Sequence, residues 1–272
     1  MCRFNRTLAA CHGQSYVIDF IKTLGHTGHP VVDLATTTKD IEQHGYSIIR
    51  GFVDADRVAE LRDLCESLKV PIETTGDDGI ARLGFRIPEI MLRTRELDSL
   101  VTDPRLLAAF RMVLGATERW GMNLSDVSVK YLSPGSGERA LHRDDDFYQQ
   151  LSRDHPFTSN ALLALDTFDE PVGATTVIPG SHGWEQPIDP DHDRISVDMD
   201  PGDLLLLSGR VWHGHGPNTT TDRIRRAFNV YVCAGWLLPG HTYKEHFSVD
   251  EFETLSPELQ ELMEVGLDPS KY

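Results

Sequence analysis

The sequence predicts a mostly β fold with flanking helices, whose core is a double-stranded β-helix, the jelly roll of cupin-like proteins. The first observation is a change of pattern near residue 126, after which short apolar runs alternate with turns that contain glycine and proline. Short strands at this spacing are typical of a two-sheet barrel. The second observation is that helical periodicity lies mainly before that point. The third is a length of 272 residues with 40% hydrophobic content, which allows one domain with a sizeable core.

Three helices are predicted outside the barrel. Two precede the strand-rich part, near residues 55–68 and 104–114, and one lies near the C-terminus, ending at residue 266. Each has an acidic or hydroxyl residue as its N-cap and apolar residues at helical spacing behind it. Proline in the first turn and glycine after the last turn mark the boundaries of two of them. The marking residues are Asp54; Asp103, Pro104 and Gly115; and Ser256, Pro257 and Gly266.

The predicted strands are short apolar runs at residues 161–165, 174–178, 204–207 and 227–233. The polar segment 185–200, which contains proline, is interpreted as a solvated loop. Residues 1–272 are expected to form a single domain, in which residues 1–30 form an N-terminal arm and residues 237–272 a C-terminal extension.

Composition excludes several classes of partner. A net charge of −16 argues against binding to nucleic acid or to an anionic membrane. No segment has the run of about eighteen apolar residues that a membrane span requires. The four cysteines are scattered without a C-x-x-C spacing, so we expect free thiols in a reducing compartment and a cytoplasmic protein.

The pair His142-x-Asp144, followed by His213, is the candidate metal site. Two imidazoles and one carboxylate form a facial triad that leaves adjacent positions open on non-haem Fe(II), as oxygen activation requires. With 12 histidines and 42 acidic residues a His-x-Asp pair arises easily by chance, so the later histidine matters. On one strand, residues i and i+2 share a face, which favours Asp144 over Asp145. His215 competes with His213 and is interpreted as a pocket-wall residue.

Four segments in order carry a family resemblance: residues 44–52, 141–145, 173–182 with its Pro-Gly-Ser-His turn, and 202–226. Together they resemble the phytanoyl-CoA dioxygenase (PhyH) superfamily of Fe(II)/2-oxoglutarate-dependent oxygenases, over a core of residues 38–236. The short spacing between His142 and His213 looks most like the subgroup that tailors fungal terpenoids and alkaloids.

The resemblance implies roles for particular residues. His142, Asp144 and His213 would bind iron, while Arg225 and Thr175 would hold the far carboxylate of 2-oxoglutarate. A guanidinium group suits this task because it binds a carboxylate through two parallel hydrogen bonds. The implied cofactors are therefore Fe(II), 2-oxoglutarate and O2.

Other residues have weaker assignments. Phe147 and Tyr148 follow the iron-binding pair and are candidates to line the pocket for a small, largely apolar substrate. Arg223 shares the expected face of Arg225 and is its rival, whereas Arg226 should point to the opposite face. Lys130 is a candidate second contact for the cosubstrate but is interpreted as a surface lysine.

The implied function is a dioxygenase that oxidises a C–H bond of a secondary metabolite and releases succinate and CO2. The outcome would be hydroxylation, desaturation, rearrangement or endoperoxidation. Two other functions stay open: a cupin-type metal enzyme that does not use 2-oxoglutarate, and a non-catalytic relative that binds a metal or ligand. A homodimer is also expected from the resemblance.

Overall fold

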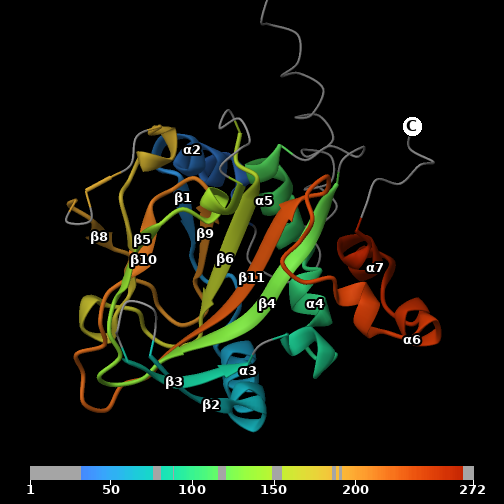
Figure 1. Ribbon diagram of the computed structural model, residues 1–272, viewed down its shortest axis with the longest axis horizontal. Coiled ribbons are helices and arrows are strands. Elements are labelled where there is room, and N and C mark those ends of the chain that lie inside the picture. The colour runs from blue at the N-terminus through green and yellow to red at the C-terminus, as the bar shows by residue number, and fades with distance from the viewer. Residues whose placement is uncertain are drawn as a thin grey trace, which may run out of the picture.

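The computed structural model describes residues 32–75, 81–87, 89–115, 121–148, 155–185, 188–189 and 192–265. Within them, two antiparallel sheets lie opposite each other, and helices cover the outer side of the larger sheet (Figure 1). The predicted arm, residues 1–30, lies outside the described residues, and the C-terminal helix predicted to end at Gly266 ends at Met263. No helix in the described part of the chain is long and apolar enough to cross a membrane.

The larger sheet has seven strands in the order β1-β9-β6-β11-β4-β3-β2. Its strands are β1 (Tyr46–Ile49), β2 (Val70–Thr75), β3 (Ala81–Ile87), β4 (Met122–Leu132), β6 (Thr158–Ala164), β9 (Leu204–Ser208) and β11 (Arg225–Ala234). The smaller sheet has the order β5-β10-β7-β8. Its strands are β5 (Arg139–His142), β7 (Thr175–Val177), β8 (Ile195–Ser196) and β10 (His213–His215).

Four of the strands, β6, β7, β9 and β11, coincide with the predicted apolar runs to within a few residues. The interpretation of residues 185–200 as a loop was wrong in one detail, because β8 lies there and pairs with β7. A strand of two residues, one of them exposed, leaves no apolar run in the sequence.

The helices begin where their caps predict. Helix α3 (Ala55–Leu68) follows Asp54, whose carboxylate accepts the backbone N–H of Arg57. Helix α5 (Pro104–Leu114) follows Asp103 and ends at Gly115 in the left-handed conformation. The remaining helical elements are α2 (Leu34–His44), α4 (Asp98–Val101), α6 (Val249–Glu253) and α7 (Pro257–Met263), and the 3-10 turns η2 (Ile90–Leu92), η3 (Asp144–Tyr148), η4 (Glu170–Val172), η5 (Ser181–Gly183) and η6 (Tyr243–His246).

Two apolar clusters divide the molecule. The outer cluster lies between the larger sheet and the helices, and receives Phe228, Val230 and Val232 from β11. The inner cluster lies between the two sheets and receives Ala227 from β11 and Val177 from β7. Because alternate residues of a strand face opposite ways, Arg225 and Asn229 share the inner face with Ala227. The space between the sheets is therefore where the site residues meet.

Candidate metal centre

Three side chains converge between β5, β10 and the start of η3. His142 and His213 are paired across β5 and β10, with ring centroids 4.4 Å apart. Oδ1 of Asp144 lies 3.6 Å from Nε2 of His142 and 3.8 Å from Nε2 of His213. One ligand atom from each residue lies within 4.8 Å of the others, and they are the one such group among the described residues. Two imidazole nitrogens and one carboxylate oxygen suit a non-haem iron ion.

His142 and Asp144 do not belong to one strand, contrary to the sequence prediction. Strand β5 ends at His142, and Asp144 begins the 3-10 turn η3. The backbone N–H of Asp145 donates to the carbonyl of Gly209 at 2.9 Å, so the turn is bonded to the segment between β9 and β10. The turn still leaves the Asp144 carboxylate beside both imidazoles, so the pair converges through a turn and not through strand alternation.

Asp145 anchors this turn. Its carboxylate accepts the backbone N–H groups of Phe157 and Thr158 and the Thr158 hydroxyl, at 2.7–3.0 Å. Burial raises the pKa of Asp145 to about 6, against these hydrogen bonds, which lower it. Gly209 makes room, because a Cβ at this position would lie 2.3 Å from Oδ1 of Asp145. Asp145 therefore holds η3 in place, and Asp144 is the residue that faces the histidines.

The histidine orientations are fixed by main-chain carbonyls. Nδ1 of His142 lies 3.1 Å from the carbonyl of Ala140, and Nδ1 of His213 lies 3.0 Å from that of Val211. Such a contact places the proton on Nδ1 and leaves Nε2 as the ligand atom. The Asn160 side-chain amide lies 3.4 Å from Oδ2 of Asp144, on the side away from the imidazoles.

The charge states also suit a metal ion. Burial, with help from the neighbouring His213 and Arg139, lowers the pKa of His142 to about 3. Burial acts to raise the pKa of Asp144, but His213, His142 and Lys130 lower it overall. Near neutral pH the site thus offers a neutral His142 and an ionised carboxylate, the forms that coordinate metal ions.

Arg225 lies deeper in the barrel, on β11. Its side chain is buried, and its Nη2 donates to the Thr175 hydroxyl at 2.9 Å. The guanidinium carbon lies 4.1 Å from the ring centre of Phe168, and Nε is buried without a partner. Burial lowers the pKa of Arg225 to about 10, so the group stays cationic at neutral pH. A buried cation with an unused donor and no carboxylate partner fits a site for an anionic ligand.

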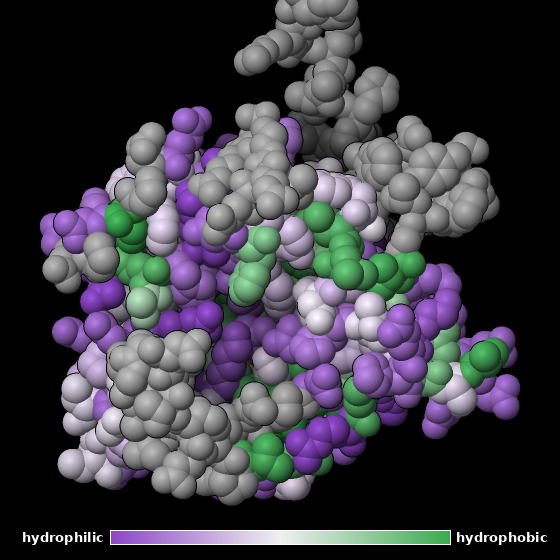
Figure 2. All heavy atoms as spheres, viewed as in Figure 1, coloured by the Kyte–Doolittle hydropathy of each residue, from purple (hydrophilic) through white to green (hydrophobic). Residues whose placement is uncertain are grey.

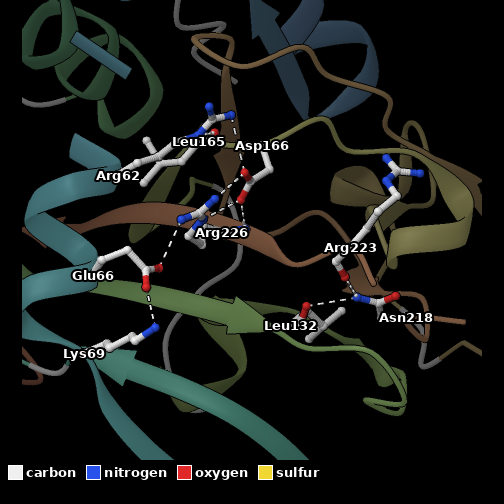
Figure 3. Close-up of polar contacts among 9 residues, drawn as sticks. All are labelled: Arg62, Glu66, Lys69, Leu132, Leu165, Asp166, Asn218, Arg223 and Arg226. Atoms are coloured by element: carbon white, nitrogen blue, oxygen red, sulfur yellow. Dashed lines mark hydrogen bonds and ion pairs between the residues drawn. The ribbon is translucent and has the colours of Figure 1, made fainter. Parts of the chain in front are cut away.

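The neighbouring arginines have structural partners, and Figure 3 shows those of Arg226. Arg226 points to the opposite face of β11, where Nε and Nη2 donate to the two carboxylate oxygens of Asp166, each at 2.8 Å, and Nη1 to Glu66. Arg223 precedes β11 and forms an ion pair with Asp169 in which its side chain stays 40% exposed. The structure therefore brings Arg225, and neither neighbour, together with Thr175.

Thr175 and the triad lie on adjacent parts of the smaller sheet. Thr175 is paired with His215 across β7 and β10, while Val177 is paired with His213. His215 is half-buried and its Nδ1 lies 2.9 Å from the carbonyl of Gly216, so it stays outside the triad.

The predicted Pro-Gly-Ser-His turn lies on η5 and is bonded to main chain. The Ser181 hydroxyl accepts the N–H of Trp212, and Nε2 of His182 lies 3.2 Å from the carbonyl of Glu42. These contacts give the turn a structural role.

The candidate substrate residues lie at the outer end of η3. Phe147 is 85% exposed, while Tyr148 donates its hydroxyl to the carbonyl of Leu238 at 3.3 Å. Trp236 is also partly exposed and packs edge-to-face on Phe157. Figure 2 shows hydrophilic residues inside a hollow near the middle of one face, with hydrophobic residues gathered elsewhere on the same face. Aromatic side chains thus lie beside η3, and polar side chains lie deeper.

Sequence reasoning missed polar residues on the inner face of the larger sheet. Asn160 on β6 and Asn229 on β11 are both buried, and each has one amide atom without a partner. Lys130 on β4 is exposed, in keeping with its interpretation as a surface lysine, but it lies on the inner face of the sheet, where its Nζ donates to Oδ1 of Asn229 at 3.0 Å. The signal available was an asparagine inside an otherwise apolar strand, which places a polar group in the core.

A family model described as phytanoyl-CoA dioxygenase (PhyH) matches residues 41–227. The chain belongs to this family. It is 34% identical to dioxygenase aneA of Aspergillus aculeatus over 149 residues, which cover 52% of this chain and 49% of that relative. It is 28% identical to the multifunctional dioxygenase ausE of Penicillium brasilianum, over 73% of this chain and 71% of that relative. The match thus spans about half the length of aneA, and the predicted resemblance is confirmed.

Solved structures of this fold include the epimerase SnoN in complex with Fe3+, alpha-ketoglutarate and nogalamycin RO. Its TM-score is 0.61 at 20% identity, and the match covers 75% of this chain and 84% of SnoN. HygX from Streptomyces hygroscopicus, solved with nickel and 2-oxoglutarate bound, has a TM-score of 0.59 at 20% identity, covering 73% and 86% of the two chains. These likenesses confirm the predicted jelly-roll fold.

Proposed function

We propose that the protein is an Fe(II)- and 2-oxoglutarate-dependent dioxygenase that oxidises a C–H bond of a small, largely apolar molecule in secondary metabolism. One observation carries this proposal: the same barrel contains a three-residue metal site and a buried Arg225, which contacts Thr175 and has no carboxylate partner among the described residues. The family membership and the fungal relatives named dioxygenases support it.

The spacing of the two parts suits the cosubstrate. Thr175 lies two residues before Val177 on β7, and Val177 is paired with His213, which is in turn paired with His142. Two residues of a strand correspond to about 7 Å, which is the reach of a five-carbon dicarboxylate. In this proposal His142, Asp144 and His213 hold the iron, and Arg225 and Thr175 hold the far carboxylate of 2-oxoglutarate.

Each protein group then has a defined task. Bound Fe(II) supplies the activation of O2 that couples decarboxylation of 2-oxoglutarate, to succinate and CO2, with oxidation of the substrate. Arg225 neutralises the far carboxylate in a buried site, where the pair is poorly screened by water. Asn160 and the anchored η3 turn hold the Asp144 carboxylate in place. Phe147 and Tyr148 offer apolar contacts to the substrate beside η3.

The cupin-type and non-catalytic functions receive no support from a specific observation. Neither would require a buried arginine without a carboxylate partner, since leaving such a charge unpaired is costly. The Arg225 guanidinium contacts Thr175 and Phe168 and forms no ion pair with any acid among the described residues.

The test is an anaerobic titration of Fe(II)-loaded protein with 2-oxoglutarate, followed by the visible charge-transfer band of the chelate. The band should form in the wild type and be absent with His213→Ala, because one of the three protein ligands is lost. Arg223→Met serves as a control for the loss of an arginine outside the site, and it should titrate like the wild type because Arg223 is paired with Asp169. A wild-type protein that binds iron but gives no band would reject the proposal.

We also propose a cytoplasmic homodimer. The free thiols of Cys65 and Cys233 fit a reducing compartment. Exposed apolar side chains such as Leu238 and Trp236 fit a contact with a second copy. Light scattering of the purified protein tests the dimer, and the mass of one chain across the micromolar range would contradict it.

A further inference from the structure

Lys130 lies on the inner wall of the larger sheet, opposite Ala227 in the pairing of β4 with β11. Ala227 belongs to the inner cluster, whereas Val129 and Tyr131, the neighbours of Lys130, belong to the outer one. The lysine side chain therefore faces the cavity. Its Nζ reaches Oδ1 of Asn229, which lies one inward-facing step further along β11.

The charge on Lys130 fixes the orientation of the Asn229 amide. An ammonium group only donates, so the amide oxygen of Asn229 must face it. Nδ2 of Asn229 then points elsewhere, and it is buried without a partner. Buried donors of this kind are costly unless a ligand supplies an acceptor. Lys130 and Asn229 thus present donors, and no acceptor, to the cavity.

The pair lies between Arg225 and the triad along β11. Arg225 precedes Asn229 by four residues, and Tyr231, paired with Asn160, follows it by two. Asn160 contacts Asp144 at the triad. The backbone of Lys130 is paired with Ala227, but its ammonium group contacts Asn229. The ammonium group therefore lies on the triad side of Ala227, whereas Arg225 lies on the other side.

The charges around Lys130 agree with this position. Burial is the main cause that lowers its pKa, Asp126 and Asp144 act to raise it, and Arg139 and Arg225 act to lower it. Asp126 is engaged elsewhere, since its carboxylate accepts the Ser128 hydroxyl at 2.7 Å and lies 3.6 Å from Nε2 of His241. Asp144 faces the two histidines as part of the triad. The hydrogen-bond partner of the Lys130 ammonium group is the neutral amide of Asn229, so an anionic ligand would complete its contacts.

We propose that Lys130, held in position by Asn229, is a third cosubstrate-binding group, which donates to the carboxylate next to the keto group of a 2-oxo acid. This inference rests on the proposed function. It assigns the two ends of 2-oxoglutarate to different cations: the far carboxylate to Arg225 and the keto-end carboxylate to Lys130. Asn229 acts through Lys130 as a positioning residue.

The test compares two ligands by anaerobic calorimetry on Fe(II)-loaded protein: 2-oxoglutarate, and 2-oxopentanoate, which lacks the far carboxylate. Lys130→Met should weaken both ligands by a similar factor of about 10 to 100, because both keep the keto-end carboxylate. Arg225→Met should weaken 2-oxoglutarate alone. Lys244→Met is the matched control, because Lys244 pairs with Glu264 outside the barrel, and it should bind both ligands like the wild type.

Two results would overturn the inference. If Lys130→Met weakens 2-oxoglutarate alone, Lys130 assists Arg225 at the far end. If it weakens neither ligand, Lys130 has no part in holding the cosubstrate. A wild-type protein that binds neither ligand would instead reject the proposed function, so the two failures are distinguishable. Unchanged iron stoichiometry and melting temperature in Lys130→Met show that the variant is folded.

A double-mutant cycle tests the positioning role of Asn229. Asn229→Leu should weaken both ligands in the wild-type background, because Lys130 loses its partner. In the Lys130→Met background the same substitution should have less than about a twofold effect. An undiminished effect there would show that Asn229 does not act through Lys130. Lys130→Arg should recover part of the affinity, since it restores the charge.

Discussion

The two faces of β11 use the same kinds of residue for opposite purposes. On the outer face, Arg226 is bonded to Asp166 and Glu66, and apolar neighbours pack on the helices. On the inner face, Arg225 and Asn229 are buried and each keeps a nitrogen without a partner. A folded chain rarely leaves buried donors unpaired. Polar groups on the outer face therefore stabilise the fold, whereas those on the inner face are available to bind a ligand.

The largest effect expected from this comparison is the loss of iron from the inner side. His213→Ala should lower Fe(II) affinity more than about 100-fold, because removing a metal ligand costs more than removing a group that only orients one. Metal analysis after gel filtration measures it. His215→Ala, two residues along the same strand and outside the triad, should retain iron at the wild-type stoichiometry. Equal iron content in the two variants would contradict the assignment.

A smaller effect is expected on the outer face. Arg226→Met should lower the free energy of unfolding by about 1–3 kcal/mol, because it breaks a bidentate, half-buried pair with Asp166. Urea unfolding of the metal-free protein measures it. Arg223→Met should cost less than about 1 kcal/mol, because its pair with Asp169 is exposed. If Arg223 proves the more stabilising of the two, the description of the outer face is wrong.

The smallest effect concerns a structural histidine. Burial lowers the pKa of His182 below its usual 6.5. Below pH 6.5 the unfolded chain therefore takes up a proton more readily than the folded one, so stability decreases as the pH falls. Unfolding of the metal-free protein between pH 8 and pH 5 should show a shallower decrease for His182→Gln than for the wild type. Identical slopes would show that His182 does not contribute.

Local signals predicted much of the fold. Caps at Asp54 and Asp103 fixed the starts of α3 and α5, because capping depends on neighbours in sequence. The strand alternation at Arg225 and Arg226 correctly separated the two faces of β11. These features need no knowledge of the tertiary structure.

The errors depend on contacts between distant segments. The turn at Asp144 depends on Gly209 and on residues 157–158, and no local pattern encodes those contacts. The inward direction of Lys130 depends on the pairing of β4 with β11. Asn229 lies within a predicted apolar run and Asn160 immediately before another, but only the assembled barrel places them near the triad and Arg225.

The central claim, that the inner face of β11 holds the cosubstrate, is tested most directly by 2-oxoglutarate affinity in two adjacent variants. Anaerobic calorimetry on Fe(II)-loaded Arg225→Met and Arg226→Met compares the same chemical change on opposite faces of one strand. Arg225→Met should bind 2-oxoglutarate at least about 10-fold more weakly than the wild type, whereas Arg226→Met should keep the wild-type affinity. Equal affinities in the two variants would contradict the claim.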